Sequence, residues 1–350
     1  MEKVKRARIQ DVAELAGVSN MTVSRVLNGG VKVSEVKRKA VMNAVERLNY
    51  SPDAAARRLA SKKSYMIGLL YQDLDISYVS KFLLRALKSC RNVDHHLVPD
   101  GIDGDIDEFY RAVKKLIDVT QIDGVILLAP ISNNPQILEL LQNAQIPFVR
   151  ISPDDHSNIS PLIAIDEFKA GYAMTEYLIS LGHTKIAHIK GHPNQAASRL
   201  REEGFEAAMQ ANNLKIRPEY IVQGYYTYDS GIPASHALLA GDDRPTAIFA
   251  ANDEMAAAAI SVANKLGIKT PQQLSVGGLD DAQLAVTMSP HLTTIRQPIM
   301  EMAELAVDLL TSNMMQTNKL LARGHRHILD FELVKRQSAT YPEINISTNK

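Results

Sequence analysis

The sequence predicts a small all-α segment at the N-terminus, followed by a much larger α/β region built as two lobes. Residues 1–65 place apolar side chains at helical spacing. From Met66 onward, short apolar runs alternate with helical stretches, which is the pattern of doubly wound α/β architecture. This pattern restarts near Ile163, after the loop "SPDDHSNISP", so two lobes account for the strands better than one small sheet.

The composition of the chain indicates in which cellular compartment the protein is expected. The chain has 350 residues, enough for two or three domains, and its longest apolar runs are far too short to cross a bilayer. The first twenty residues are basic and lack the apolar core of a signal peptide. The single cysteine, Cys90, excludes an internal disulfide framework and fits a reducing compartment. We therefore expect a cytoplasmic protein with no membrane segment.

The formal net charge of zero conceals a division along the chain. Residues 1–65 contain 14 Lys/Arg and 6 Asp/Glu, whereas residues 66–350 contain 25 and 33. A solvated helical face is the ordinary explanation of a charge run. An excess confined to one short segment fits docking on a polyanion better, because neutralising phosphates releases counterions. Charge alone would suit DNA, RNA or an acidic membrane surface.

The first two helices are expected on either side of a tight turn. Ile9, Val12 and Ala16 fall on one helical face, and Gly17 can end that helix because it tolerates positive φ. Ser19 can then cap a second helix over "NMTVSRVL". Two short helices joined at "AGVS" form a helix-turn-helix, whose second helix enters the DNA major groove.

A third helix, which Ser34 can cap, would pack apolar residues between positions 41 and 48 against the first two helices. The competing interpretation is a three-helix bundle of no special purpose. The exposed face of the second helix argues against it, because residues 19–28 include short polar groups and Arg25 but no acid. Basic charge, a glycine turn and an acid-free face together favour DNA binding.

The apolar runs of the α/β region are expected to be strands. Several are apolar throughout, as expected of parallel strands covered on both faces. The runs are "MIGLLY", "HHLVPD", "GVILLA", "PFVRIS", "PLIAID", "KIAHIK", "AIFAAN" and "LSVGGL". A ligand cleft would then lie between the lobes, at the carboxyl ends of the strands.

The N-terminal motif "IQDVAELAGVSNMTVSRVLNG", followed by "VSEVKRKAVMNAVERLNYSPDAAARRLAS", resembles the DNA-binding headpiece of the LacI/GalR (lactose-repressor) family. The resemblance implies that Asn20, Met21 and Arg25 read base edges. Asn can pair with adenine, Met can contact a thymine methyl, and Arg can take guanine O6 and N7. Phosphate contacts are expected from three further residues of this segment: Thr22, Ser24 and Asn28.

The same resemblance implies a hinge helix in "NYSPDAAARRLASKKS" that folds on DNA and pairs with its twin from a second subunit. Leu59 would be the apolar wedge in the minor groove with Ala56 beside it, and Arg57 would contact the backbone. Without the resemblance, this stretch would be interpreted as a linker. Asp53 stands where many relatives have Asn, and we expect no direct DNA contact from this acid.

The remaining chain resembles the family's effector domain, which is itself similar to periplasmic sugar-binding proteins. The landmarks "ISLGHTKIAHIKG", "SRLREEGF", "PTAIFAANDEMA", "LSVGGLDD" and "LTTIRQP" occur in order. The implied domains are a headpiece with hinge helix over 1–64 and an effector-binding and dimerisation domain over 65–350. We expect lobe 1 over about 65–162 and 293–330, and lobe 2 over about 163–292 and 331–345.

The resemblance also assigns candidate effector contacts. They are Arg201, Tyr226, Asn252, Asp280 and Gln297 in the motifs above, with Asp75, Ser77 and Tyr78 after the first strand. These residue types suit a sugar, because carboxylates accept from hydroxyls, guanidinium donates, and amides do both. A helix cap or surface ion pair is the alternative for each residue taken singly.

Enzyme interpretations find little support. The pairs His95–His96 and His325–His327 lack metal-ligand spacing, and no nucleophile elbow or phosphate-binding loop is present. We therefore expect no catalytic residues, no cofactor and no metal. The expected function is a DNA-binding repressor of sugar-utilisation genes, acting in the bacterial cytoplasm on the nucleoid. It would bind a pseudo-palindromic operator as a homodimer under control of a sugar effector, with a purine corepressor as the alternative.

Overall fold

The computed structural model describes residues 7–27, 33–50, 63–72, 76–102, 106–154, 157–241, 243–312 and 325–343. The chain divides into two compact units, Met1–Ser64 and Tyr65–Lys350. No helix in the described ranges has the length and apolar character needed to span a membrane.

The first unit contains three helices around a small apolar core. They are α1 (Ile9–Ala16), α2 (Asn20–Leu27) and α3 (Glu35–Arg47). Gly17 ends α1 with φ of 63°, a left-handed conformation, and its N–H reaches the carbonyls of Ala13 and Glu14. Ser19 caps α2 as predicted, since its Oγ accepts the Thr22 N–H at 3.3 Å. Ser34 occupies the N-cap position of α3 but makes no side-chain cap bond.

The core of this unit includes Val12 and residues of the 41–48 stretch, as the periodicity predicted. Six apolar residues are buried and come from all three helices: Val12, Ala13, Val23, Val26, Val41 and Ala44. Because α2 turns Val23 and Val26 inward, its opposite face remains exposed. The helices α1 and α2 therefore form a helix-turn-helix.

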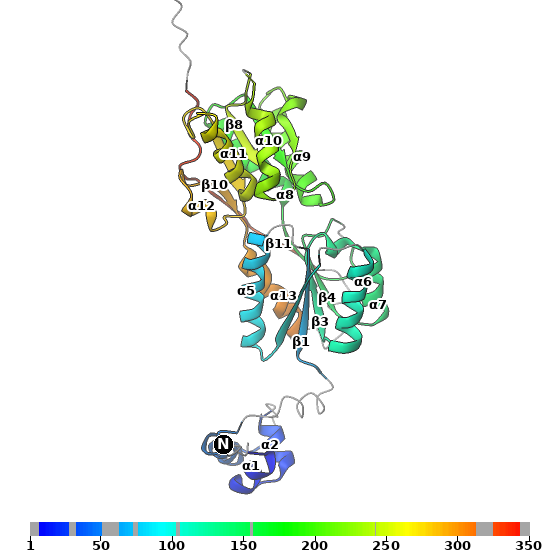
Figure 1. Cartoon of the computed structure of the whole chain (residues 1–350). Coiled ribbons are helices and arrows are strands. Elements are labelled where there is room, and N and C mark those ends of the chain that lie inside the picture. The colour runs from blue at the N-terminus through cyan, green and yellow to red at the C-terminus, as the bar shows by residue number, and fades with distance from the viewer. Residues whose placement is uncertain are drawn as a thin grey trace, which may run out of the picture. The chain divides into compact units, whose positions relative to one another are not determined.

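The second unit contains two six-stranded sheets, one in each lobe (Figure 1). The first has the order β11-β5-β4-β3-β1-β2 and is parallel throughout. Its strands are β1 (Met66–Tyr71), β2 (His96–Gly101), β3 (Gly124–Leu127), β4 (Phe148–Ile151), β5 (Leu162–Ile165) and β11 (Arg326–Leu329). Its helices are α5 (Ile76–Asn92), α6 (Ile106–Lys115), η1 (Leu116–Thr120), η2 (Ile131–Asn133), α7 (Pro135–Asn143) and α13 (Ile299–Thr311).

The second sheet has the order β12-β10-β9-β8-β6-β7, with only the β10–β12 pair antiparallel. Its strands are β6 (Ile186–Lys190), β7 (Ile221–Gln223), β8 (Ala247–Ala250), β9 (Ser275–Leu279), β10 (Thr293–Arg296) and β12 (Glu332–Val334). Its helices are α8 (Glu167–Ser180), α9 (Ala196–Ala211), η3 (Pro218–Tyr220), α10 (Tyr228–Leu239), α11 (Asp253–Lys265) and α12 (Leu284–Thr287).

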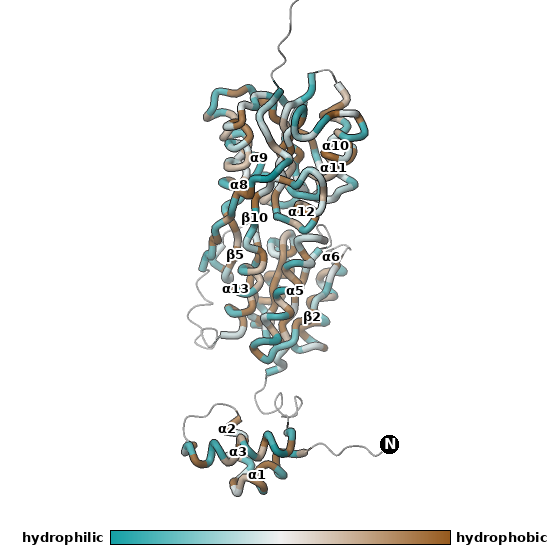
Figure 2. The backbone as a smooth tube through the Cα atoms, turned by 90° about the vertical axis from the view of Figure 1, so that its left-hand side faces the viewer, coloured by the Kyte–Doolittle hydropathy of each residue, from teal (hydrophilic) through white to brown (hydrophobic). Residues whose placement is uncertain are grey.

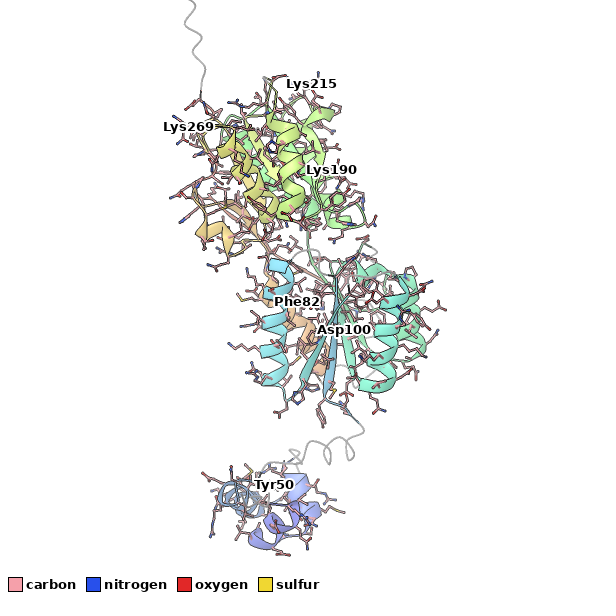
Figure 3. All side chains as sticks on the ribbon, in the orientation of Figure 1. Tyr50, Phe82, Asp100, Lys190, Lys215 and Lys269 are labelled. Carbon is pink, nitrogen blue, oxygen red and sulfur yellow. The ribbon has the colours of Figure 1, made fainter. Side chains whose placement is uncertain are left out.

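Helices cover both faces of each sheet. In the first lobe α5 and α13 lie on one face and α6 and α7 on the other (Figure 1). Figure 2 shows hydrophobic stretches in the interior of both lobes. The strands β3, β4, β5, β8 and β9 are buried along their whole length, as expected of strands covered on both faces. Phe82 of α5 is fully buried in this core, whereas Lys215 and Lys269 are exposed on the second lobe (Figure 3).

The chain makes its first two crossings between lobes a few residues later than the sequence predicted. Residues 163–165 and 293–296 were assigned to the lobes they would enter, but β5 belongs to the first sheet and β10 to the second. The crossings lie between β5 and α8, between β10 and α13, and between β11 and β12. The physical reason is that each strand completes its pairing before the chain leaves the sheet, and apolar runs do not reveal which sheet they join.

Helices α8 and α9 of the second lobe pack in unusually close contact through glycines. A Cβ on Gly171 would lie 2.3 Å from the Arg201 carbonyl oxygen, and one on Gly204 would lie 2.1 Å from the Phe168 carbonyl oxygen. Such distances are far inside van der Waals contact. Only glycine at both positions permits this backbone separation.

We predict that Gly204→Ala destabilises the protein by about 1–3 kcal/mol, because the two helices must move apart to admit a methyl group. Urea unfolding of the variant and wild type measures the difference. Gly241→Ala is the matched control, since no described atom lies within 4 Å of a Cβ built there. Equal stability of all three proteins would contradict the close packing of α8 on α9.

Candidate functional site

A cleft between the two lobes lies where strands of both sheets end. Its empty volume is about 620 Å³, including space open to solvent. Gln72, Leu128, Ser152 and Glu167 follow strands of the first sheet, whereas Tyr226, Asp280 and Gln297 follow strands of the second. The lining residues are Gln72, Tyr78, Val79, Leu128, Ala129, Ile151, Ser152, Glu167, Gln195, Ala197, Arg201, Tyr226, Asp280 and Gln297. The carboxyl ends of parallel strands are the usual place for a ligand in α/β folds.

The structure brings together most of the side chains that were predicted to contact an effector. Five of them line the cleft: Tyr78, Arg201, Tyr226, Asp280 and Gln297. Ser77 lies in the first turn of α5 but is not among the lining residues. Asp75 lies outside the described residues. Asn252, discussed below, is not among the lining residues either.

Arg201 is the charged centre of the cleft. It projects from α9, and its Nε donates to Glu167 Oε2 at 2.7 Å while its Nη1 donates to the Ala251 carbonyl at 2.5 Å. The guanidinium carbon lies 5.8 Å from the centroid of the Tyr226 ring, a cation–π contact. Neither hydrogen bond uses Nη2. Arg201 can therefore hold the cleft wall and still offer a donor to a ligand.

Burial and charge act in opposite directions on the pKa of Arg201. The residue is only 4% exposed, and desolvation by itself lowers the pKa. The charge of Glu167, followed by smaller effects of Tyr226 and Asp280, outweighs desolvation and raises the pKa above its ordinary value. Arg201 is therefore cationic at neutral pH.

Glu167 is a cleft residue that the sequence did not reveal. It is the first residue of α8, directly after the chain leaves β5, and it is buried. The close packing of α8 on α9 at Gly171 and Gly204 brings its carboxylate to Arg201. The only sequence feature that pointed to Glu167 was its position after a buried strand. Asp166 has the same position, and nothing in "IAIDEF" distinguishes the two acids.

Asp280 and Gln297 form a second polar pair across the cleft wall. Gln297 Nε2 donates to Asp280 Oδ1 at 2.6 Å, and both residues are at most 5% exposed. Gln297 Oε1 is buried and has no hydrogen-bond partner among the described residues. A buried acceptor without a donor is costly, so this oxygen is a natural contact for a ligand hydroxyl or N–H group.

Backbone strain collects around the cleft. Ser152, Tyr226 and Asp280 adopt positive φ values of 47°, 64° and 116°, which non-glycine residues rarely take. The Tyr226 ring lies against Gly191, where a Cβ would come within 2.0 Å of the ring. Such conformations persist where the surrounding structure holds them, and they concentrate at binding sites.

Asn252 forms hydrogen bonds with backbone groups of the second lobe. Its Nδ2 donates to the Tyr226 carbonyl at 2.7 Å, and its Oδ1 accepts the Met255 N–H at 3.1 Å as the N-cap of α11. It is 1% exposed. Asn252 therefore holds the strained backbone that presents Tyr226. Its predicted contact with an effector stays a prediction.

Two contacts join the lobes beside the cleft. Asp154, in the loop after β4, accepts the Ala196 N–H at the start of α9 at 2.7 Å. Lys81 of α5 donates to the Asp281 carbonyl at 3.4 Å. Asp281 also binds Arg296 and Arg336, so the residue next to Asp280 is held by the chain near the crossings. The cleft and the connections between lobes therefore share residues.

The first unit presents the side chains predicted to read DNA. Asn20, Met21 and Arg25 are exposed on α2, and Met21 retains 64% of its surface. Thr22 and Ser24 are partly exposed on the same helix. Asn28 and the hinge residues Ala56, Arg57 and Leu59 lie outside the described residues, as does Asp53. Within the ranges that the structure describes, no cluster of His, Cys, Asp and Glu is arranged to bind a metal.

Comparison with known proteins assigns both units. Residues 8–53 match the family described as "Bacterial regulatory proteins, lacI family", and residues 175–339 match "Periplasmic binding protein-like domain". The chain is 35% identical to the ribose operon repressor of Escherichia coli (strain K12) over 310 residues, which cover 89% of this chain and 94% of the relative. It is 35% identical to the HTH-type transcriptional repressor PurR of Vibrio vulnificus (strain CMCP6) over 305 residues, 87% of this chain and 91% of the relative.

A solved structure of the lac repressor dimer, bound to operator and the anti-inducer ONPF, has the same fold with a TM-score of 0.78. It is 27% identical, and the match covers 96% of this chain and all of the other. These relatives are transcriptional regulators and not enzymes. The headpiece, the two-lobed domain and the level of identity agree with one another, and the chain belongs to the LacI family of bacterial regulatory proteins.

Proposed function

We propose that this protein is a sequence-specific repressor of sugar-utilisation genes whose operator binding is controlled by a small sugar bound between the two lobes. The observation that carries the proposal is a buried polar cleft, holding an unpaired acceptor on Gln297, in the same chain as an exposed helix-turn-helix. The ribose operon repressor and the operator-bound lac repressor are relatives with this combination. The site of action would be DNA in the cytoplasm, on the nucleoid.

Helix α2 would enter the major groove, with Asn20, Met21 and Arg25 at base edges and Thr22 and Ser24 toward phosphates. The absence of acids in α2 supports this orientation. Asn28 would add a phosphate contact, and Leu59 with Ala56 and Arg57 would engage the minor groove.

The protein would act as a homodimer on a pseudo-palindromic operator, because one headpiece contacts too few base pairs and two-fold protein symmetry requires two half-sites. The operator-bound lac repressor is a dimer. Analytical ultracentrifugation of the protein–operator complex measures this, and a single subunit per operator would contradict it.

Within the cleft, Arg201 would donate to a sugar hydroxyl, and Asp280 and Gln297 would accept from others. Tyr78 and Tyr226 would contact the apolar faces of the ring. Ser77 and Asp75 remain candidate effector contacts. No residue of this set is proposed to be catalytic.

A purine acting as corepressor is the second candidate. Two aromatic side chains, Tyr78 and Tyr226, line the cleft and could stack on a base, and the PurR proteins are relatives at similar identity. A thermal-shift screen against sugars and nucleobases distinguishes the two classes, since a ligand at 100 times its Kd adds about 2.7 kcal/mol of stability.

Arg25→Ala is predicted to relax sequence choice, because a bidentate contact to guanine contributes about 1–3 kcal/mol of discrimination. The measurement is the ratio of affinities for an operator selected from random DNA and for unrelated DNA, at one salt concentration. Arg47→Ala, at the exposed end of α3, also removes one positive charge and should weaken both affinities alike. An unchanged ratio for Arg25→Ala would contradict base reading by this residue.

Arg201→Lys is predicted to weaken effector binding at least tenfold while leaving operator affinity without effector unchanged. Lysine keeps the charge beside Glu167 but loses the guanidinium fork, and one hydrogen bond to a charged donor contributes about 1.5–3 kcal/mol. Alanine is unsuitable here, since an unpaired buried carboxylate costs about 3–5 kcal/mol of stability.

Operator binding titrated with effector measures the response of wild type and Arg201→Lys. The control is Arg199→Lys, an exposed position on the same helix whose side chain pairs with Glu203. If Arg201→Lys responds at the same effector concentration as wild type, Arg201 does not contact the effector.

A further inference from the structure

We infer that the cleft binds an uncharged sugar and discriminates against the phosphate ester of that sugar. This inference rests on the proposed function, because it concerns the effector of the same cleft. The described lining residues include three charged side chains, Glu167, Arg201 and Asp280. Two acids and one cation give the lining a net charge of −1.

The cation of the cleft is already neutralised. Arg201 and Glu167 form a buried ion pair at 2.7 Å, with side chains 5% and 6% exposed. The Ala251 carbonyl occupies a second donor of the guanidinium. A phosphate group would therefore add a third negative centre beside one compensated cation, where little solvent is available to screen repulsion.

The hydrogen-bonding groups of the cleft also favour a free sugar over its phosphate ester. Gln297 Oε1 can only accept, and the carboxylates of Asp280 and Glu167 also only accept. A phosphate dianion offers acceptors alone, whereas each sugar hydroxyl can donate. The uncharged polar residues that complete the lining are Gln72, Tyr78, Ser152, Gln195 and Tyr226.

Two helix N-termini at the cleft, which are common backbone sites for anions, are already occupied by acidic side chains. The first N–H of α9, on Ala196, donates to Asp154 Oδ1 at 2.7 Å. In α8, the Lys169 N–H donates to Asp166 Oδ1 at 3.0 Å. These acids repel a second anion at the starts of α8 and α9, whereas the first turn of α5, which also borders the cleft at Tyr78, contains no acid.

The test is isothermal titration of the full chain with matched pairs of free sugars and their monophosphates. D-ribose with D-ribose 5-phosphate and D-glucose with D-glucose 6-phosphate form the first panel, extended to further pairs and to hypoxanthine. A pH above 7 keeps the esters close to dianionic. We expect at least one free sugar to bind and its ester to bind at least about tenfold more weakly, because the ester carries uncompensated charge.

Glu167→Gln is the decisive variant. It removes one acid and makes the lining neutral, so the ratio of ester Kd to sugar Kd should fall at least about tenfold. Glu203→Gln also removes one acid from this lobe, but on the surface of α9, and should leave the ratio unchanged. Circular dichroism and thermal melting establish that each variant is folded. If Glu167→Gln does not fold, Asp280→Asn makes the same charge change at another lining residue of the cleft.

The outcomes separate the inference from the proposed function. An ester that binds as tightly as its free sugar, or more tightly, would overturn the inference while leaving a sugar-responsive regulator intact. If Glu167→Gln is folded and its ratio of ester Kd to sugar Kd equals that of the wild type, the inference is also overturned. Heat from hypoxanthine with none from any sugar or ester would overturn the sugar effector itself, together with this inference.

Discussion

The buried ion pair between Glu167 and Arg201 is the interaction on which the second unit of this protein depends. It joins α8 to α9, reaches the end of β8 through the Ala251 carbonyl, and faces the Tyr226 ring. Gly171 and Gly204 allow the two helices that carry the pair to approach closely. Breaking one side of such a pair leaves an uncompensated charge on a side chain that is almost fully buried. The geometry of the cleft is therefore determined by helix packing that begins several residues away.

The position of this pair connects ligand binding to lobe geometry. Glu167 begins α8 directly after the first crossing, and Gln297 lies on the second crossing between β10 and α13. Asp280 is bonded to Gln297, and its neighbour Asp281 is held by Arg296 and Arg336. A ligand that satisfies Gln297 and Arg201 thus acts on the segments about which the lobes would rotate. Effector binding in the cleft and operator binding would then be linked by a coupling free energy.

The sequence was a good guide where local chemistry determines the outcome. Gly17 and Ser19 defined the turn between α1 and α2, and the family motifs placed Arg201, Tyr226, Asp280 and Gln297 at one cleft. Asn252 was assigned as a ligand contact by its position in the family resemblance, with a helix cap as the alternative. Its hydrogen bonds show that it caps α11, and the effector contact stays a prediction.

Other features could not be predicted from the sequence because they depend on tertiary packing. Nothing in the residues around Glu167 indicates that its partner lies 34 positions later on a neighbouring helix. The contact of Asp154 with the start of α9 joins two lobes and has no local signature. The crossings at β5 and β10 were placed a few residues too early for a related reason. The residues of an apolar run do not indicate which sheet the strand will join.

The most direct test of the link between cleft and headpiece is to measure how effector and operator change each other's affinity for the protein. Effector affinity is determined for the free protein and for the operator-bound protein, and operator affinity is determined with and without saturating effector. The account predicts that both affinities change by the same factor, about 5- to 150-fold, as a coupling free energy of about 1–3 kcal/mol requires. An effector affinity that does not change when operator is bound would contradict it.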